Sequence, residues 1–193
     1  MADAETTFLT SAERTILLEL GRTSIKCGLA QGRPLKLDLA DYPPTLRRRR
    51  GSFVTLRVRR ELRGCIGSVE AVAPLVEDVA FNAHAAASRD PRFAPLQAGE
   101  LADLHIHISV LSPLEELVFI SQEDLLQQIR PGVHGLVLEA DGQRATLLPA
   151  VWERISEPAE FLRHLKRKAG LALDCDLGGA RMWRYEVESA SEE

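Results

Sequence analysis

The chain has 193 residues, of which 45% are hydrophobic, so it is long enough to bury a core of its own. A formal net charge of -4 and a pI near 5.8 exclude a uniformly basic nucleic-acid coat, and no apolar run approaches the ~20 residues of a membrane span. Three cysteines without a Cys-x-x-Cys pair exclude a disulfide framework and a zinc ribbon, and no signal-peptide pattern opens the chain; together these features predict a cytoplasmic protein.

The N-terminal part is predicted to be a flexible tail over residues 1–9 followed by a helix. Thr10 or Ser11 can cap this helix, which ends near residues 28–32. Cys27 lies on its apolar face and is interpreted as a small core residue. Residues 33–46 contain three prolines and are predicted to be an extended connector.

An arginine-rich segment follows the connector. Residues 47–63 contain eight arginines and one acidic residue, a local charge of +7 on a body that carries -11. Such a segment can bind the phosphate groups of a nucleotide or of RNA, or it can be a solvated loop with ion pairs to the acidic body. Phe53 is the one aromatic residue among these arginines, which favours the solvated loop over a single-strand binder.

Two strands are predicted within and after the arginine run. Residues 53–59 alternate between apolar and polar residues, and the link Arg60–Glu61 is short enough to return the chain as a hairpin. The second strand, residues 62–68, places Cys65 between Gly64 and Gly67, beside Val54 or its neighbours. Glycines inside a strand mark a bulge or the close approach of another backbone or of a ligand.

The remainder of the chain alternates short helices and strands. A helix is predicted from Pro74 to the stop at residues 90–93, and a strand over residues 104–111 with His105 and His107 on its polar face. Further elements are a helix at 123–129, a hairpin of 135–138 and 145–148 across Asp141–Gly142, a helix at 161–169, a strand at 182–187 and a flexible tail at 189–193. This order predicts an α+β fold with a mainly antiparallel sheet flanked by helices.

Cys65 is the first candidate for chemistry. A neighbouring positive charge favours the thiolate, and Arg57, Arg59 and Arg63 are close to it in sequence or across the hairpin. A structural cysteine in a crowded sheet is the alternative. His134 lies in a glycine-flanked turn, where it can act as a general base or simply as a turn residue.

The pair His105 and His107 has the spacing with which a strand offers two imidazoles to a metal ion, but such a site needs a third ligand. The candidates Cys65, His84 and His134 are not tied to the pair by any spacing. No metal site is therefore predicted. Phosphate-loop, dinucleotide, Gly-x-Ser-x-Gly and His-Glu-x-x-His motifs are absent from the sequence, and no cofactor is specified.

Several segments, spread over nearly the whole chain, together resemble the AMMECR domain family. They are residues 51–56, 62–68 (Leu-Arg-Gly-Cys-Ile-Gly-Ser), 90–93 (Asp-Pro-Arg-Phe), 108–113, 147–149 and 168–171. The Leu-Arg-Gly-Cys-Ile-Gly segment is highly specific to this family. The stand-alone prokaryotic form, of about this size, is called AmmeMemoRadiSam system protein A.

The resemblance implies a single AMMECR-like domain over residues 1–193, with a larger and a smaller lobe and the Cys65 strand near the cleft between them. It implies as partners a Memo-like protein and a radical S-adenosylmethionine protein, but it supplies no reaction. The positions that it implies line a site are Arg63, Gly64, Cys65, Gly67, Asp90, Arg92 and His134.

Two functions follow from these observations. In the first, the protein is an enzyme or enzyme subunit in which Cys65 and His134 are catalytic and Arg63, Gly64, Gly67, Asp90 and Arg92 bind a small anionic substrate. In the second, it is a non-catalytic module that presents a basic cleft to a metabolite, a nucleic acid or a partner protein. The glycine-flanked cysteine favours the first.

Overall fold

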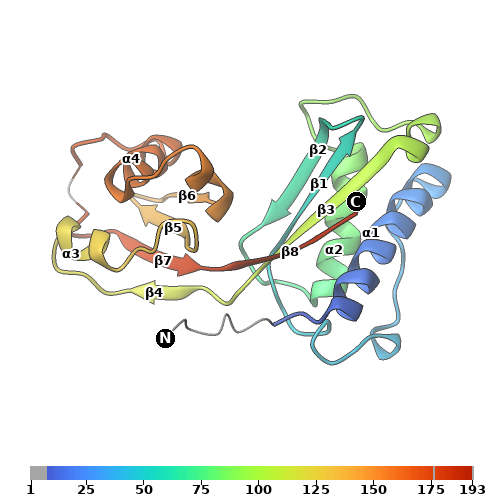
Figure 1. The fold of residues 1–193 in the computed structure, drawn as a ribbon, viewed down its shortest axis with the longest axis horizontal. Coiled ribbons are helices and arrows are strands. Elements are labelled where there is room, and N and C mark those ends of the chain that lie inside the picture. The colour runs from blue at the N-terminus through green and yellow to red at the C-terminus, as the bar shows by residue number, and fades with distance from the viewer. Residues whose placement is uncertain (1–7, 176, 193) are drawn as a thin grey trace. The chain divides into compact units, whose positions relative to one another are not determined.

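A computed structural model describes residues 8–175 and 177–192 and divides the chain into two compact units (Figure 1). Unit 1 consists of the chain up to Leu111 together with the C-terminal segment from Glu188, and unit 2 consists of Ser112–Val187. The parts of the predicted tails at residues 1–7 and at residue 193 lie outside the described residues. Each unit has its own sheet and its own apolar core.

Unit 1 is a four-stranded sheet with two helices on one face (Figure 1). The strand order is β2-β1-β3-β8, and β1 pairs antiparallel with both β2 and β3. The elements are α1 (Ser11–Gln31), η1 (Leu39–Asp41), β1 (Ser52–Val58), β2 (Glu61–Ser68), α2 (Leu75–Ser88), η2 (Ala98–Asp103), β3 (Leu104–Leu111) and β8 (Val187–Ser191).

The alternation of the strands sorts their side chains onto two faces. Val54, Leu56, Ile106 and Ile108 are fully buried and pack with residues of α1 and α2 in one core. The opposite face, here called the outer face, carries the polar residues of the same strands. Its members in β1, β2 and β3 include Phe53, Thr55, Cys65, His107 and Ser109.

The helix predicted at the N-terminal end is confirmed as α1. Thr10 is its N-cap and forms a reciprocal capping box with Glu13, and Gly32 ends it with a φ of 70°. Cys27, expected in the core, is only half-buried. Leu9 is 1% exposed, so the N-terminal segment is already packed against the core at this residue, inside the stretch expected to be a flexible tail.

The predicted hairpin of β1 and β2 is confirmed, and its turn is made without glycine. Arg59 and Arg60 adopt positive φ values of 51° and 70° between the strands. The register shifts after Leu56, so that Arg63 has no partner residue on β1 and forms a β-bulge. The bulge lies two residues before Cys65.

Unit 2 is built on a second antiparallel sheet with the strand order β4-β7-β5-β6. Phe161 stacks on Trp152 at 3.9 Å between ring centroids in its core. The hairpin across Asp141–Gly142 is confirmed, with positive φ at both turn residues. The elements are β4 (Glu115–Leu117), α3 (Gln122–Gln127), β5 (Gly135–Ala140), β6 (Gln143–Leu147), η3 (Pro149–Glu153), α4 (Pro158–Lys168) and β7 (Arg181–Tyr185).

The C-terminal end differs from the prediction. One strand was expected over residues 182–187, but the structure has two strands here, β7 and β8, which belong to different sheets. Residues 189–191, expected to be part of a flexible tail, lie in β8, where Ala190 packs into the core of unit 1 at 3% exposure. The predicted α+β fold with antiparallel sheets flanked by helices is confirmed. Within the described ranges, no helix is both long and apolar enough to cross a membrane.

Candidate functional site

Cys65 lies on the outer face of the sheet in unit 1, with its side chain half-buried. Its cross-strand neighbour on β1 is Thr55, whose Oγ1 atom is 3.2 Å from the Cys65 Sγ atom. Thr55 in turn faces His107 on β3. The three side chains therefore form a row across the strands, with a thiol, a hydroxyl and an imidazole in that order.

Asp90 and Arg92 complete the edge strand at Cys65. The backbone N–H of Cys65 donates to Asp90 Oδ2 at 2.8 Å, and its carbonyl accepts from Arg92 Nη2 at 3.3 Å. Arg92 also donates to both oxygens of Asp90, from Nε at 2.9 Å and from Nη2 at 2.7 Å. The ion pair thus takes the place that a neighbouring strand would have, because it satisfies both backbone groups at the edge.

The two members of this ion pair differ in their exposure to solvent, and each shifts the pKa of the other. Hydrogen bonds from Arg92 hold the pKa of the Asp90 carboxyl well below its usual range, although burial opposes them. The pKa of Arg92 is raised, mainly by its hydrogen bonds to Asp90 and to a smaller extent by Cys65. Asp90 is nearly fully buried, whereas the Arg92 side chain is 54% exposed. The exposed part of the pair is therefore its cation.

The two glycines beside Cys65 are explained by the protein's own backbone. A Cβ atom on Gly64 would lie 2.1 Å from the Ala86 carbonyl oxygen of α2. One on Gly67 would lie 2.2 Å from the Ser52 carbonyl oxygen of β1. Of the features that glycines inside a strand can mark, the structure shows two: a bulge at Arg63, directly before Gly64, and the close approach of another backbone at both glycines.

Arg63 is fixed by other parts of unit 1. It donates to both carboxylate oxygens of Glu100, from Nε at 2.7 Å and from Nη2 at 3.0 Å. It also donates to the carbonyl oxygens of Ala94 and Pro95. These bonds tie the bulge of β2 to η2 and to the loop that precedes it, so Arg63 holds the scaffold of the site.

His134 lies in unit 2, whereas the other predicted site residues lie in unit 1. Its ring is buried beside Arg130, whose backbone N–H and Nε each lie 3.1 Å from one of the ring nitrogens. Burial, with Arg130 and Arg184, lowers the pKa of His134 to about 4. Trp152 Nε1 donates to its carbonyl oxygen at 2.7 Å. These contacts hold the turn that contains His134.

The two histidines of β3 differ in their surroundings. His105 is exposed, while His107 is half-buried, with its Nε2 atom 3.3 Å from Ser109 Oγ. Burial lowers the pKa of His107, and Arg57 adds to this effect. Over residues 8–175 and 177–192, no three histidine, cysteine or acidic side chains gather in a way that could hold a metal ion.

Several arginines of the basic run are bound to the scaffold. Arg47 donates to the Tyr42 carbonyl, and Arg49 donates to the Val72 carbonyl at 2.8 Å. Arg50 lies over the ring of Phe8. Part of the run therefore braces the loops that surround β1.

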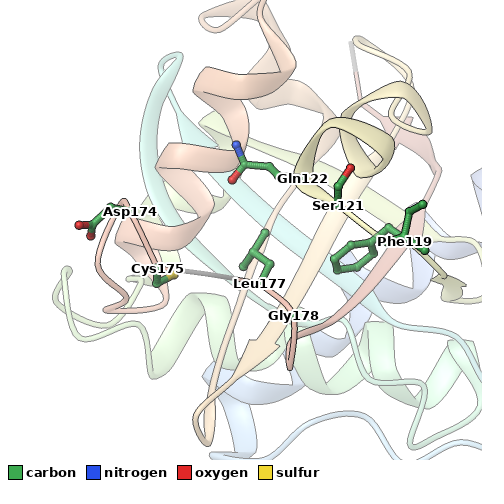
Figure 2. Close-up of a pocket in the computed structure, with 8 residues that line it drawn as sticks. Phe119, Ser121, Gln122, Asp174, Cys175, Leu177 and Gly178 are labelled. Carbon is green, nitrogen blue, oxygen red and sulfur yellow. The ribbon is translucent and has the colours of Figure 1, made fainter.

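Unit 2 contains a pocket of about 680 Å³, and none of the predicted site residues is among those that line it (Figure 2). Its walls come from the segment before α3 and from the loop after α4. Lys166, 2% exposed, ties these walls together by donating to Gln122 Oε1 and to the Leu173 and Cys175 carbonyls. The lining residues are Phe119, Ile120, Ser121, Gln122, Asp174, Cys175, Leu177 and Gly178.

The structure thus gathers six of the seven predicted positions in or around β2. Cys65, Asp90 and Arg92 are in direct contact, Gly64 and Gly67 allow the sheet to pack, and Arg63 anchors the bulge. Sequence analysis missed Thr55, although it lies in the predicted strand. The residue opposite Cys65 depends on the register, which the bulge at Arg63 shifts.

The site is thus an edge-strand cysteine held by the Asp90–Arg92 ion pair, in a chain with two separate antiparallel sheets. The sequence model of the AMMECR1 family matches residues 18–190. The chain belongs to this family.

Relatives and a solved structure agree with this assignment. A protein of Methanothermobacter thermautotrophicus is 39% identical over 184 residues, covering 93% of this chain and 94% of the relative. A protein of Saccharolobus solfataricus is 41% identical over 167 residues, with 83% and 72% covered. The crystal structure of an uncharacterised protein from Pyrococcus horikoshii has a TM-score of 0.87 at 32% identity, covering 97% of this chain and 95% of that one.

Proposed function

We propose that this protein is an enzyme, or a subunit of one, in which the Cys65 thiolate attacks or covalently holds a small anionic substrate. The observation that carries this proposal is the position of Arg92 at the edge of β2, where its Nη2 group donates to the Cys65 backbone carbonyl. The thiol is half-buried, and Cys65 is among the groups that raise the pKa of Arg92, so the charge of the guanidinium acts on this cysteine. A cation near a thiol is typical of a reactive cysteine.

Arg92 can serve the substrate as well as the thiol. Its Nε and Nη2 groups bind Asp90 and the Cys65 carbonyl, but no described residue accepts a hydrogen bond from its Nη1 group. Asp90 fixes the orientation of the guanidinium, so little entropy is lost when an anion binds to the remaining donor. A carboxylate or phosphate held there would place an attached electrophilic atom near the Cys65 sulfur.

The proposal is tested with two small electrophiles that differ in charge. In a Cys27→Ser, Cys175→Ser background, Cys65 is labelled with anionic iodoacetate and with neutral iodoacetamide at low salt. We expect the ratio of the iodoacetate rate to the iodoacetamide rate to be about five times the ratio for free cysteine, because a nearby cation attracts the anionic reagent. A ratio equal to that of free cysteine contradicts anion binding at this site.

Matched variants separate Arg92 from the general positive charge of the region. Arg92→Gln should bring the ratio to that of free cysteine, while Arg92→Lys should keep most of the preference. Arg57, which is exposed on β1 and donates to the Arg60 carbonyl, provides the control. If Arg57→Gln lowers the ratio as much as Arg92→Gln does, the preference belongs to the surface charge and not to a site.

The partners of this function are proposed on the resemblance to AmmeMemoRadiSam system protein A. They are a Memo-like protein and a radical S-adenosylmethionine protein, and the site of action is proposed to be the cytoplasm. A partner that engages the site should change the rate of Cys65 labelling when the purified proteins are mixed. Unchanged labelling, together with no co-elution in size-exclusion chromatography, would remove the partner from the proposal.

A binding module is the second candidate, and the eight arginines of residues 47–63 favour it. Such a module would present its basic surface to a metabolite, a nucleic acid or a partner protein. Binding to single-stranded RNA should then weaken steeply with salt and be unaffected by Cys65→Ser. Under the first function, the same substitution abolishes turnover but preserves affinity for the substrate.

A further inference from the structure

Thr55 is a residue to which the proposed function assigns no role. It lies in the middle of β1 on the outer face, and its Oγ1 atom is 3.2 Å from Cys65 Sγ. Cys65 is the hydrogen-bond partner of this hydroxyl, and no other described residue bonds to it. The hydroxyl proton is therefore available to the sulfur.

We propose that Thr55 is the positioning residue of Cys65, because its hydroxyl donates to the thiolate and fixes the direction in which the sulfur points. This inference rests on the proposed function of Cys65. With the neutral thiol, either atom can be the donor. Once the thiol has lost its proton, the sulfur can only accept, so the hydroxyl must donate.

Thr55 approaches the Cys65 sulfur from the neighbouring strand, with Oγ1 at 3.2 Å from Sγ. The Arg92 guanidinium lies at the free edge of β2, where it donates to the Cys65 backbone carbonyl. The backbone N–H of Cys65 donates to Asp90 and is therefore not available as a hydrogen-bond donor to the sulfur. Threonine is suited to this position because its branched Cβ restricts rotation about χ1 and is readily accommodated in a strand.

The hydrogen bond predicts a specific loss of reactivity. Labelling with neutral iodoacetamide forms a bond from the thiolate sulfur to carbon, breaks the carbon–iodine bond, and releases iodide with the electron pair. This reagent has no charge for Arg92 to attract, so the rate reports the thiolate alone. A hydrogen bond to a charged group is strong enough to change the population of the thiolate about tenfold.

The experiment compares four variants in the Cys27→Ser, Cys175→Ser background at pH 7.5. Thr55→Val and Thr55→Ala should each label about tenfold more slowly than the background protein, and Thr55→Ser should restore the rate to within twofold. Ser109→Ala is the matched control, because it removes a hydroxyl from the same face that bonds to His107 and not to Cys65. This control should label at the background rate.

Any of three results would overturn the inference. The first is that Thr55→Val or Thr55→Ala labels as fast as the background protein. The second is that Thr55→Ser labels as slowly as Thr55→Val, and the third is that Ser109→Ala reproduces the loss. If the background protein itself labels no faster than a free thiol, the proposed function of Cys65 fails before Thr55 is considered. The two failures are therefore distinguishable.

Discussion

Asp78 shows how one buried side chain sets a pH dependence. It lies on α2, where its Oδ2 atom accepts hydrogen bonds from Ser52 Oγ at 2.6 Å and from Asn82 Nδ2 at 2.9 Å. Both partners are neutral, so burial dominates and raises the pKa of Asp78 to about 6. The carboxyl joins α2 to the start of β1.

The first prediction concerns Asp78→Asn. Since the native pKa of Asp78 lies above that of the unfolded chain, its stabilising contribution is complete below about pH 4 and is lost as the pH rises through about 6. The amide that replaces the carboxyl cannot ionise, and its oxygen can still accept both hydrogen bonds. We expect the variant to gain up to about 3 kcal/mol of unfolding free energy at pH 8 and almost none at pH 4, as measured by urea denaturation. An equal effect at both pH values would contradict this account.

At the site, sequence analysis could identify residues but not their roles. The glycines around Cys65 can be noticed in the sequence, but the backbone groups that require them belong to Ala86 and Ser52. Arg63 and Arg92 carry the same charge near the same strand, yet Glu100 engages the first and Asp90 the second. Only the fold decides which cation remains exposed beside the thiol.

At the scale of elements, β2 is held by α2 on one face and by the Asp90–Arg92 ion pair at its edge. The helix can lie this close because Gly64 has no side chain. Its backbone meets the last full turn of α2 at Ala86. The edge contacts then also prevent another strand from pairing at Cys65.

The second prediction is that Gly64→Ala destabilises the protein by about 3 kcal/mol, because the new methyl group would displace the backbone of α2 from β2. Gly99→Ala is the matched control, since a Cβ there meets nothing within 4 Å. It should be neutral or slightly stabilising. Denaturant melts of both variants measure the difference, and equal stability of the two would show that the close contact is not limiting.

Elements with strong local signals were predicted well, and those that depend on distant partners were not. β3 was expected over residues 104–111 from its alternation and has these bounds, and the hairpin at Asp141–Gly142 follows from turn residues that favour positive φ. β4 was missed because its three residues form a strand only by pairing with β7. The division of residues 181–191 into two strands depends on two sheets from distant parts of the chain.

At the scale of the whole molecule, the unfolding of unit 2 can be measured separately from that of unit 1. Both tryptophans, Trp152 and Trp183, lie in unit 2, so their fluorescence reports the unfolding of this unit. Trp152 also contacts the turn that contains His134, because it donates to the carbonyl of that residue. The probe is therefore close to the titrating group.

The third prediction is that unit 2 loses stability in acid. Since the pKa of His134 is lowered to about 4, its neutral form is favoured in the native state, and this contribution is complete above about pH 6.5. We expect the unfolding free energy of unit 2 to fall by up to about 3 kcal/mol as the pH is lowered to 4, as measured by tryptophan fluorescence during urea denaturation. His134→Gln should flatten this dependence, whereas the half-exposed His164, changed to glutamine, should not. If the unfolding free energies of both variants depend on pH to the same extent, the pH dependence does not come from His134.

The most direct test of the central claim is the rate at which iodoacetamide labels Cys65 in the folded protein, compared with the same chain unfolded in urea. Both measurements use the Cys27→Ser, Cys175→Ser background at pH 7.5, so that Cys65 is the one thiol present. If Arg92 and Thr55 activate Cys65, we expect labelling about tenfold faster in the folded state than in the unfolded chain, because a nearby cation and a hydrogen-bond donor favour the thiolate. Slower labelling in the folded state would make Cys65 a sheltered structural residue and contradict its proposed catalytic role.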